Sequence, residues 1–266
     1  MFSWQHIVWL IICVAAIFAS QVVYSRKRPS LDTVLTFALF ISVLSELSKM
    51  VSVIELVPST DGDLLLPYLP LNHLPLHFCS IQILLIFYVR FAEDRRKRES
   101  VLAFMYATTI IVGILALIMP SIFSTTVSPE EAFTTLVSYQ FFIFHAMIIS
   151  LGIIIVRSGE IKWRKEHFRD TLAIVYAFGF LSIYINSLFA SPTYEDGELI
   201  SVDFWTNFFF TYQNPLGIRL TKIWQWYLYL LIIIILAVVL LFLFLLPLVF
   251  RKKAKRGQEG PERNQG

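Results

Sequence analysis

Charged residues are scarce in this sequence, and their scarcity excludes a soluble protein. Only 15% of its 266 residues are Asp, Glu, Lys or Arg, while 57% are hydrophobic and the mean hydropathy is +0.69. A soluble domain of ordinary composition carries about 25% charged residues to cover its surface. Cysteine is scarce too, because only Cys13 and Cys79 occur, both in apolar surroundings, and they provide no disulfide framework.

Other features are missing as well. The sequence contains no redox or nucleotide-binding motif, no internal repeat and no linker between domains. The residues before the first apolar run carry no Lys or Arg, whereas a cleavable signal peptide has its positive charge there. We therefore expect that run to be a retained membrane helix. We expect membrane lipids as partners, with no nucleic acid and no soluble cofactor, and the oligomeric state stays open.

Long hydrophobic runs are abundant. A helix that crosses the roughly 30 Å of hydrocarbon in a bilayer needs about 20 mostly apolar residues. Proline or charge punctuates most gaps between the runs, which suits helix ends. We predict an all-α polytopic bundle of seven transmembrane helices in residues 1–250, followed by a basic, disordered tail in residues 251–266. The predicted spans are 4–24, 31–57, 74–91, 101–119, 133–156, 171–190 and 226–250.

The basic residues predict the orientation of this bundle. All but three of the 22 Lys and Arg residues fall on one side of the predicted membrane, in or beside residues 26–28, 90–98, 157–169 and 251–263. Short cytoplasmic loops are enriched in Lys and Arg. The pattern therefore predicts a protein of the cell membrane with its N-terminus outside and its C-terminus in the cytoplasm.

The second span carries two opposite charges, Glu46 and Lys49. Charges inside a membrane span are costly and are usually functional. The two residues are three apart and share one helical face, which Ser42, Ser45 and Ser52 extend into a polar stripe. Two interpretations remain open. The pair is a buried ion pair that fixes packing, or one member orients a catalytic group or binds a headgroup.

The third span opens on the segment Leu-Pro-Leu-His-Phe-Cys at residues 74–79. Pro75 suits the first turn of a helix, so we expect the helix to begin there. Cys79 would then lie near the positive end of the helix dipole, which favours the nucleophilic thiolate. His77 projects to another side of the helix and is a poor direct base for that thiol. His73 and His77 have the i, i+4 spacing of a metal pair, but Pro75 separates them and no third ligand clusters with them, so we predict no metal site.

His145 in the fifth span has apolar neighbours and should face the interior, where a packing role and a catalytic role both remain open. Counting 1.5 Å per residue places it about 18 Å along its helix, while Glu46 lies about 16 Å below the outer face. Asn186 lies in the outer third of the sixth span. The polar groups of several spans thus fall between the outer surface and the midplane, and we predict an outward-opening cavity that they share.

The last external segment, residues 191–225, is long for a helical bundle and rich in Phe near residues 204–215. We expect it to lie on the bilayer surface or to fold over the cavity. A lid, a gate for lipids and a plain interfacial packing segment all remain open for it.

In these segments the sequence resembles the YwaF-type integral membrane family, which includes vertebrate transmembrane protein 164. The similarity rests on residues 74–80, His145, the stretch 207–215, and the Trp224 to Tyr227 segment. The resemblance implies a seven-helix fold and a phospholipid acyltransferase activity. It also implies that Cys79 is the acyl-accepting nucleophile and that His145 is its general base.

Two functions therefore compete. The first is acyl transfer on membrane lipids by Cys79 and His145, and the second is transport or lipid binding at the stripe of Glu46 and Lys49. A retinal protein is a poor third hypothesis, because residues 226–250 contain no lysine for a Schiff base. The predicted supporting residues are His77, Glu46, Lys49, Gln82, Gln140, Asn186, Asn207 and Tyr212.

Overall fold

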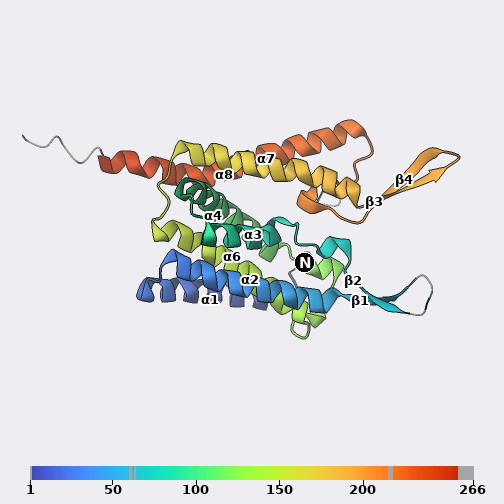
Figure 1. Ribbon diagram of the computed structural model, residues 1–266, viewed down its shortest axis with the longest axis horizontal. Helices are drawn as coiled ribbons and strands as arrows, with labels where there is room; N and C mark the ends of the chain where they lie inside the picture. Colours follow the sequence, from blue (N-terminus) through green and yellow to red (C-terminus); the bar gives the residue numbers. More distant parts are fainter. Residues whose placement is uncertain (1, 60–61, 63, 215–217, 257–266) are drawn as a thin grey trace, which may run out of the picture.

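The computed structural model describes residues 2–59, 62, 64–214 and 218–256, and these residues form a bundle of helices (Figure 1). The helices are α1 (Trp4–Lys27), α2 (Leu31–Val53), α3 (Phe78–Phe91), α4 (Arg95–Ile118), the short α5 (Ile122–Thr125), α6 (Leu136–Ser158), α7 (Lys165–Leu188) and α8 (Ile223–Arg256). Three 3-10 turns complete the helical elements: η1 (Leu71–His73), η2 (Pro129–Glu131) and η3 (Phe208–Phe210).

Each predicted span overlaps one of the seven helices α1, α2, α3, α4, α6, α7 and α8. Within the described residues, six helices are long and apolar enough to cross a membrane: α1, α2, α4, α6, α7 and α8. The remaining helix, α3, has 14 residues and is therefore about 21 Å long, which is less than the bilayer's hydrocarbon thickness. The prediction of an all-α membrane bundle is confirmed. Residues 257–266, the end of the predicted tail, lie outside the described residues, and α8 continues through the basic run to Arg256.

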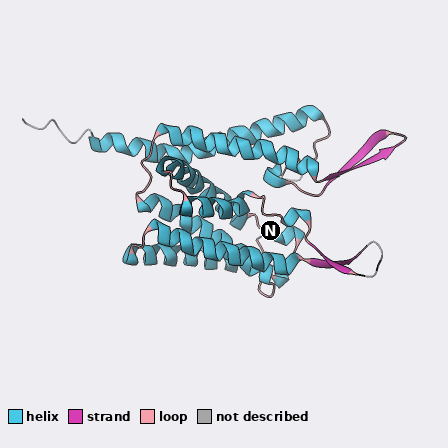
Figure 2. Ribbon diagram, in the orientation of Figure 1, coloured by secondary structure: helices cyan, strands magenta, loops and turns pink. Residues whose placement is uncertain are grey.

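In the described chain the strands occur only in two antiparallel hairpins (Figure 2). The first pairs β1 (Glu55–Pro58) with β2 (Leu65–Tyr68), so that Glu55 lies opposite Tyr68. The second pairs β3 (Ala190–Glu195) with β4 (Glu198–Phe204), with an irregularity at Thr193 and Tyr194. Both hairpins project from the same end of the bundle, which we call the hairpin end (Figure 1). The chain begins at this end, and α8 finishes at the opposite one.

Local sequence signals fix the starts of several helices. Ser3 and Ser30 cap α1 and α2, because their hydroxyls accept hydrogen bonds from the backbone N–H groups of His6 and Thr33. Asp94 caps α4 by accepting from the N–H groups of Lys97 and Arg96. These bonds to the charged carboxylate hold the pKa of Asp94 below its ordinary value.

The core of the bundle is the contact between α4 and α6, the two most buried long helices. Small residues let these helices approach closely. A Cβ at Gly152 would collide with Thr109 and Ile110, and one at Gly113 would meet the Ile149 side chain. On one side α1 and α2 pack against α6, and on the other α7 and α8 pack against α4 (Figure 1).

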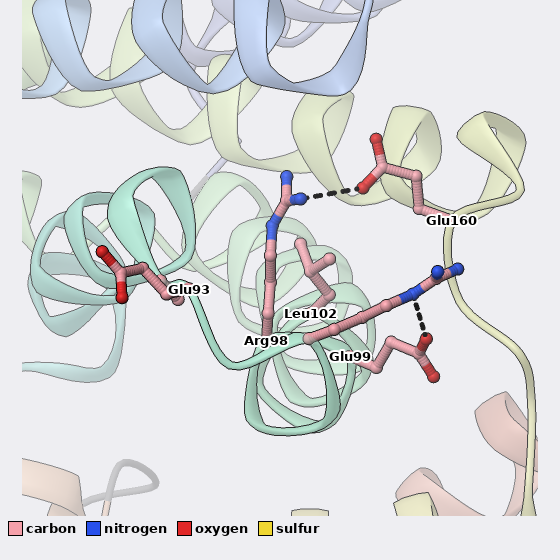
Figure 3. Close-up of a pocket in the computed structure, with 7 residues that line it drawn as sticks. Glu93, Arg98, Glu99, Leu102 and Glu160 are labelled. Carbon is pink, nitrogen blue, oxygen red and sulfur yellow. Dashed lines mark hydrogen bonds and ion pairs between the residues drawn. The ribbon is translucent and has the colours of Figure 1, made fainter.

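Ion pairs tie the elements together at the end opposite the hairpins, which we call the basic end. The Arg98 guanidinium contacts Asp32 of α2 at 2.5 Å and Glu160 of the α6–α7 loop at 3.3 Å. Glu99 contacts Arg95 at 3.3 Å and Arg164 at 3.4 Å. Arg95, Arg98, Glu99 and Glu160 line a hollow of about 350 Å³ (Figure 3). Their ion pairs and those to Asp32 and Arg164 join α2, α4 and the α6–α7 loop.

Candidate functional site

A polar interior lies between α2, α3, α4 and α6. These four helices form a ring in which α2 and α4 each contact both α3 and α6. Two side-chain hydrogen bonds join members of the ring. Gln140 of α6 donates to the Ser45 hydroxyl of α2 at 2.8 Å, and Gln82 of α3 donates to the Thr108 hydroxyl of α4 at 3.0 Å. Gln82 and Gln140 were predicted as supporting residues, whereas Thr108 was missed.

This interior contains polar atoms that lack partners. The Ser42 hydroxyl and the Gln82 carbonyl oxygen are buried and make no hydrogen bond to any described residue. Buried polar atoms are nearly always paired in native proteins. Ser42 lies one turn from Ser45 on the same face of α2, so both belong to the polar stripe that the sequence predicted. The interior can therefore take hydrogen bonds from a polar ligand or from water.

Helix α3 begins at Phe78, three residues later than the predicted start at Pro75. Pro75 and Leu76 form a turn instead, and His77 becomes the N-cap residue with an extended backbone. The first helical hydrogen bond runs from the Ile81 N–H to the His77 carbonyl. The N–H groups of residues 78–80 consequently have no acceptor within the helix.

Cys79 lies in this first turn of α3, and it is partly exposed. It shares one helical face with Gln82 and Ile86, at the spacings i, i+3 and i+7. Gln82 and Ile86 are both buried against the ring. The face that carries the thiol is therefore the interior face. The His77 ring points elsewhere, since it bonds the Asn72 carbonyl at 3.1 Å and packs edge-on against Phe208.

His145 is buried on α6 between aromatic rings. Its Nδ1 lies 2.6 Å from the carbonyl oxygen of Phe141, one turn earlier in the helix. A carbonyl only accepts, so Nδ1 carries the proton and donates it in this bond. In the neutral ring Nε2 is then the basic nitrogen. The rings of Phe141 and Phe144 contact the imidazole, with centroids 4.2 and 5.5 Å away.

The contacts that α3 and α6 make with α4 allow the positions of Cys79 and His145 along the bundle axis to be compared. Gln82 bonds Thr108, and Cys79 lies three residues, or about 4.5 Å, nearer the hairpin end. The His145 carbonyl faces Gly113, which lies five residues, or about 7.5 Å, beyond Thr108 in the same direction. The two residues thus fall within about one helical turn of each other in height.

Glu46 and Lys49 form an ion pair in the part of the α2 stripe that lies nearer the hairpin end. Their side chains approach to 2.5 Å and are only 20% and 13% exposed. No group of three His, Cys, Asp or Glu side chains in the described residues is arranged to hold a metal ion.

The Phe-rich segment folds over the start of α3. Phe208 contacts the His77 ring at 4.8 Å, and Phe209 contacts the Phe78 ring at 4.0 Å, both between ring centroids. Phe209 also stacks on Phe178 of α7 at 6.2 Å. Of the alternatives left open by the sequence, the structure therefore favours a segment that covers part of the bundle.

Asn186 of α7 clamps this segment. Its amide nitrogen donates to the Phe208 carbonyl at 3.0 Å and to the Thr211 hydroxyl at 2.9 Å. Its oxygen accepts from the Phe208 N–H and the Thr206 hydroxyl, both at 2.9 Å. All of its hydrogen-bonding capacity is used.

Asn207 and Tyr212 brace the same segment. Asn207 accepts from the N–H groups of Tyr212 and Gln213, both at 3.2 Å, and the Tyr212 hydroxyl donates to the Ile183 carbonyl at 3.2 Å. Like Asn186, these predicted supporting residues hold the covering segment in place. The structure does not bring them together with Gln82 and Gln140 in the four-helix interior.

Long apolar helices around a polar interior define a polytopic α-helical membrane protein. The profile of the TMEM164 family matches residues 1–245, so the chain belongs to the TMEM164 family. This finding confirms the family that the segment at residues 74–80 and His145 indicated. No curated protein and no solved structure shows significant similarity to the chain.

Proposed function

We propose that this protein is a membrane acyltransferase in which Cys79 accepts the acyl group of a phospholipid and His145 is the general base. The observation that carries the proposal is the position of Cys79. It lies in the first turn of α3, on the face that turns toward the polar interior, and at about the height of His145. His145 supports the role because its Nδ1 bond leaves Nε2 as the proton acceptor.

The reaction divides into two acyl transfers. The thiol proton passes to Nε2 of His145 while the sulfur attacks the ester carbonyl. The tetrahedral intermediate then loses the glycerol oxygen, which takes the proton from the imidazolium, and a lysophospholipid leaves. A hydroxyl of a second lysophospholipid next gives its proton to His145 and attacks the thioester. The Cys79 sulfur leaves and regains the proton, so no further reactant is needed.

The start of α3 offers stabilisation for the negative oxygen in both steps. The N–H groups of residues 78–80 have no acceptor in the helix, and the positive end of the helix dipole lies at the same place. Such N–H groups stabilise the oxyanion of acyl transfer when they point at it. Gln82, one turn below, donates its amide to Thr108, so its free carbonyl oxygen is suited to accept from a lipid hydroxyl.

We also propose a membrane topology for the chain. The chain crosses the cell membrane seven times with its N-terminus outside, and α3 together with the turn at residues 71–77 makes the third crossing. The N-terminus and both hairpins lie at one end of the bundle, and the Arg-rich network lies at the other, as the distribution of basic residues requires for cytoplasmic loops. The substrate is then a lipid of the outer leaflet.

The test uses the purified full chain in vesicles that contain a phospholipid and a lysophospholipid with distinguishable headgroups. Mass spectrometry follows the acyl group from one headgroup to the other. Cys79→Ala should abolish the transfer, while Cys13→Ala, which removes the other free thiol at a buried site on α1, should keep it. Equal transfer by wild type and Cys79→Ala would reject the proposal.

A transporter or lipid-binding protein is the second candidate, and the ion pair of Glu46 and Lys49 favours it. A nearly buried pair is costly to desolvate, which is one reason such pairs mark sites of function in membranes. In this case Glu46→Gln should abolish lipid binding or movement in the same vesicles. Cys79→Ala should then be without effect.

A further inference from the structure

An apolar groove of about 130 Å³ lies between α3 and α7, beneath the Phe-rich segment. Ile81 and Leu84 line it from α3, Phe178 and Leu181 line it from α7, and Phe208 and Phe209 close one end. From Phe178 to Ile185 it follows α7 for seven residues, or about 10 Å. Its lining is almost wholly hydrocarbon, and the hydroxyl of its one serine, Ser182, is bonded to the Gly179 carbonyl.

The groove is open on one side and closed on the other. Leu84 and Leu181 at its rim are 64% and 50% exposed, whereas Ile81 and Phe208 at its floor are only 6% and 1% exposed. The open side lies on the outer surfaces of α3 and α7. In a membrane bundle these surfaces face the hydrocarbon of the bilayer. The molecule that meets this opening is therefore a lipid chain.

The groove reaches the first turn of α3, where Leu76 and Ile81 line it. Cys79 lies in the same turn, but at 3.6 residues per turn it is about 160° away from Ile81 around the helix, on the interior face. The groove and the thiol therefore lie on opposite sides of the start of α3, and both reach the end of the helix where the unbonded N–H groups lie.

Phe209 is held in an unusual backbone conformation at this place. Its φ is +59°, and that of Phe210 is +54°, in the left-handed region that bulky residues rarely adopt. Such strain persists only where surrounding contacts enforce it, and it clusters at binding sites. Here the Asn186 bonds to Phe208 and the stacking of Phe209 on Phe78 and Phe178 enforce it. The result is an aromatic end wall for the groove.

We propose that this groove holds an acyl chain of a membrane phospholipid, with its opening to the bilayer between Leu84 and Leu181 and with Phe208 and Phe209 closing the end at the first turn of α3. Occupation of the groove by a lipid chain does not require the proposed acyl transfer.

The test is photocrosslinking in vesicles of phosphatidylcholine that carries a diazirine in one acyl chain, with the full-length protein and peptide mapping. The readout is labelling of the buried floor residues Ile81 and Phe208, compared with labelling of Leu188, a 77% exposed position that does not line the groove. Leu181→Trp should fill the groove and lower floor labelling about tenfold, the effect of excluding about two methylenes from an apolar site. Leu188→Trp, on the same helix, is the matched control and should leave it unchanged.

Two results would overturn the proposal that the groove holds a lipid chain: floor labelling no stronger than background in the wild type, or floor labelling that survives Leu181→Trp. Phe209→Ala should open the end of the groove at the first turn of α3 and lower floor labelling, and unchanged labelling would remove Phe209 as the end wall. Cys79→Ala distinguishes occupation of the groove from acyl transfer, because this variant should keep floor labelling and lose transfer. If Cys79→Ala keeps both, the groove stands as a lipid site and the proposed function fails.

Discussion

The Asn186 clamp allows the sharpest prediction from the structure. Asn186→Ala removes four hydrogen bonds and leaves the buried Phe208 N–H and the buried Thr206 hydroxyl without a partner, while the Phe208 carbonyl keeps its bond from the Thr211 hydroxyl. A buried polar group that loses its partner costs about 1–3 kcal/mol, so two such groups amount to about 2–6 kcal/mol. The cost falls on the segment that covers α3 and not on the contact between α4 and α6. We therefore expect local opening of residues 204–213 while the bundle stays folded.

Hydrogen exchange followed by mass spectrometry measures this opening directly. A loss of about 2–6 kcal/mol corresponds to amide exchange that is roughly 30- to 20,000-fold faster in residues 204–213. Peptides of α4 and α6 should keep their protection. Asn72→Ala is the control, because the Asn72 side chain is exposed while only its backbone carbonyl contacts His77. Unchanged exchange at residues 204–213 in Asn186→Ala would refute the role given to the clamp.

Three further predictions concern the core and the site. Gly152→Leu should destabilise the protein by about 1–3 kcal/mol in thermal unfolding, because the new side chain would collide with Thr109. Gly179→Ala is the control and should be neutral or stabilising, because a Cβ at this position would meet open space. His145→Gln should fold normally in the same assay and lower acyl transfer by about 10²- to 10⁴-fold, the usual contribution of a general base. Activity near the wild-type level would exclude His145 as the general base. In a Cys13→Ala background, a short thiol crosslinker should bridge the cysteine of His145→Cys to Cys79. If every such crosslinker failed, the two positions would be too far apart to act together.

Much of the bundle could be predicted from the sequence, because long apolar runs leave a membrane helix as the main option. The ends of the helices were less predictable. Residues 54–57 belong to the predicted second span, but α2 ends at Val53 and Glu55–Pro58 form strand β1, since a short apolar stretch next to a proline suits either structure. Pro75 suits the first turn of a helix in general, yet here it forms a turn with Leu76 and α3 starts at Phe78.

The candidate site was predictable where a residue type is costly in a membrane. Glu46 and Lys49 stand out for that reason, and the structure pairs them. The bond between Gln82 and Thr108 was not predictable, because it depends on which faces of α3 and α4 meet. The clamp of Asn186 on Phe208 likewise depends on a chain reversal between residues 186 and 208 that no local pattern in the sequence encodes.

The acyl-enzyme on Cys79 is the most direct test of the central claim. Wild-type protein and His145→Gln are each incubated with phospholipid vesicles, stopped with acid and digested, and the peptide that contains Cys79 is weighed by mass spectrometry. The account predicts a thioester-linked acyl group on Cys79 that hydroxylamine removes, and much less of it in His145→Gln. Acyl transfer that proceeds in the wild type with no acyl group on Cys79 would contradict the account.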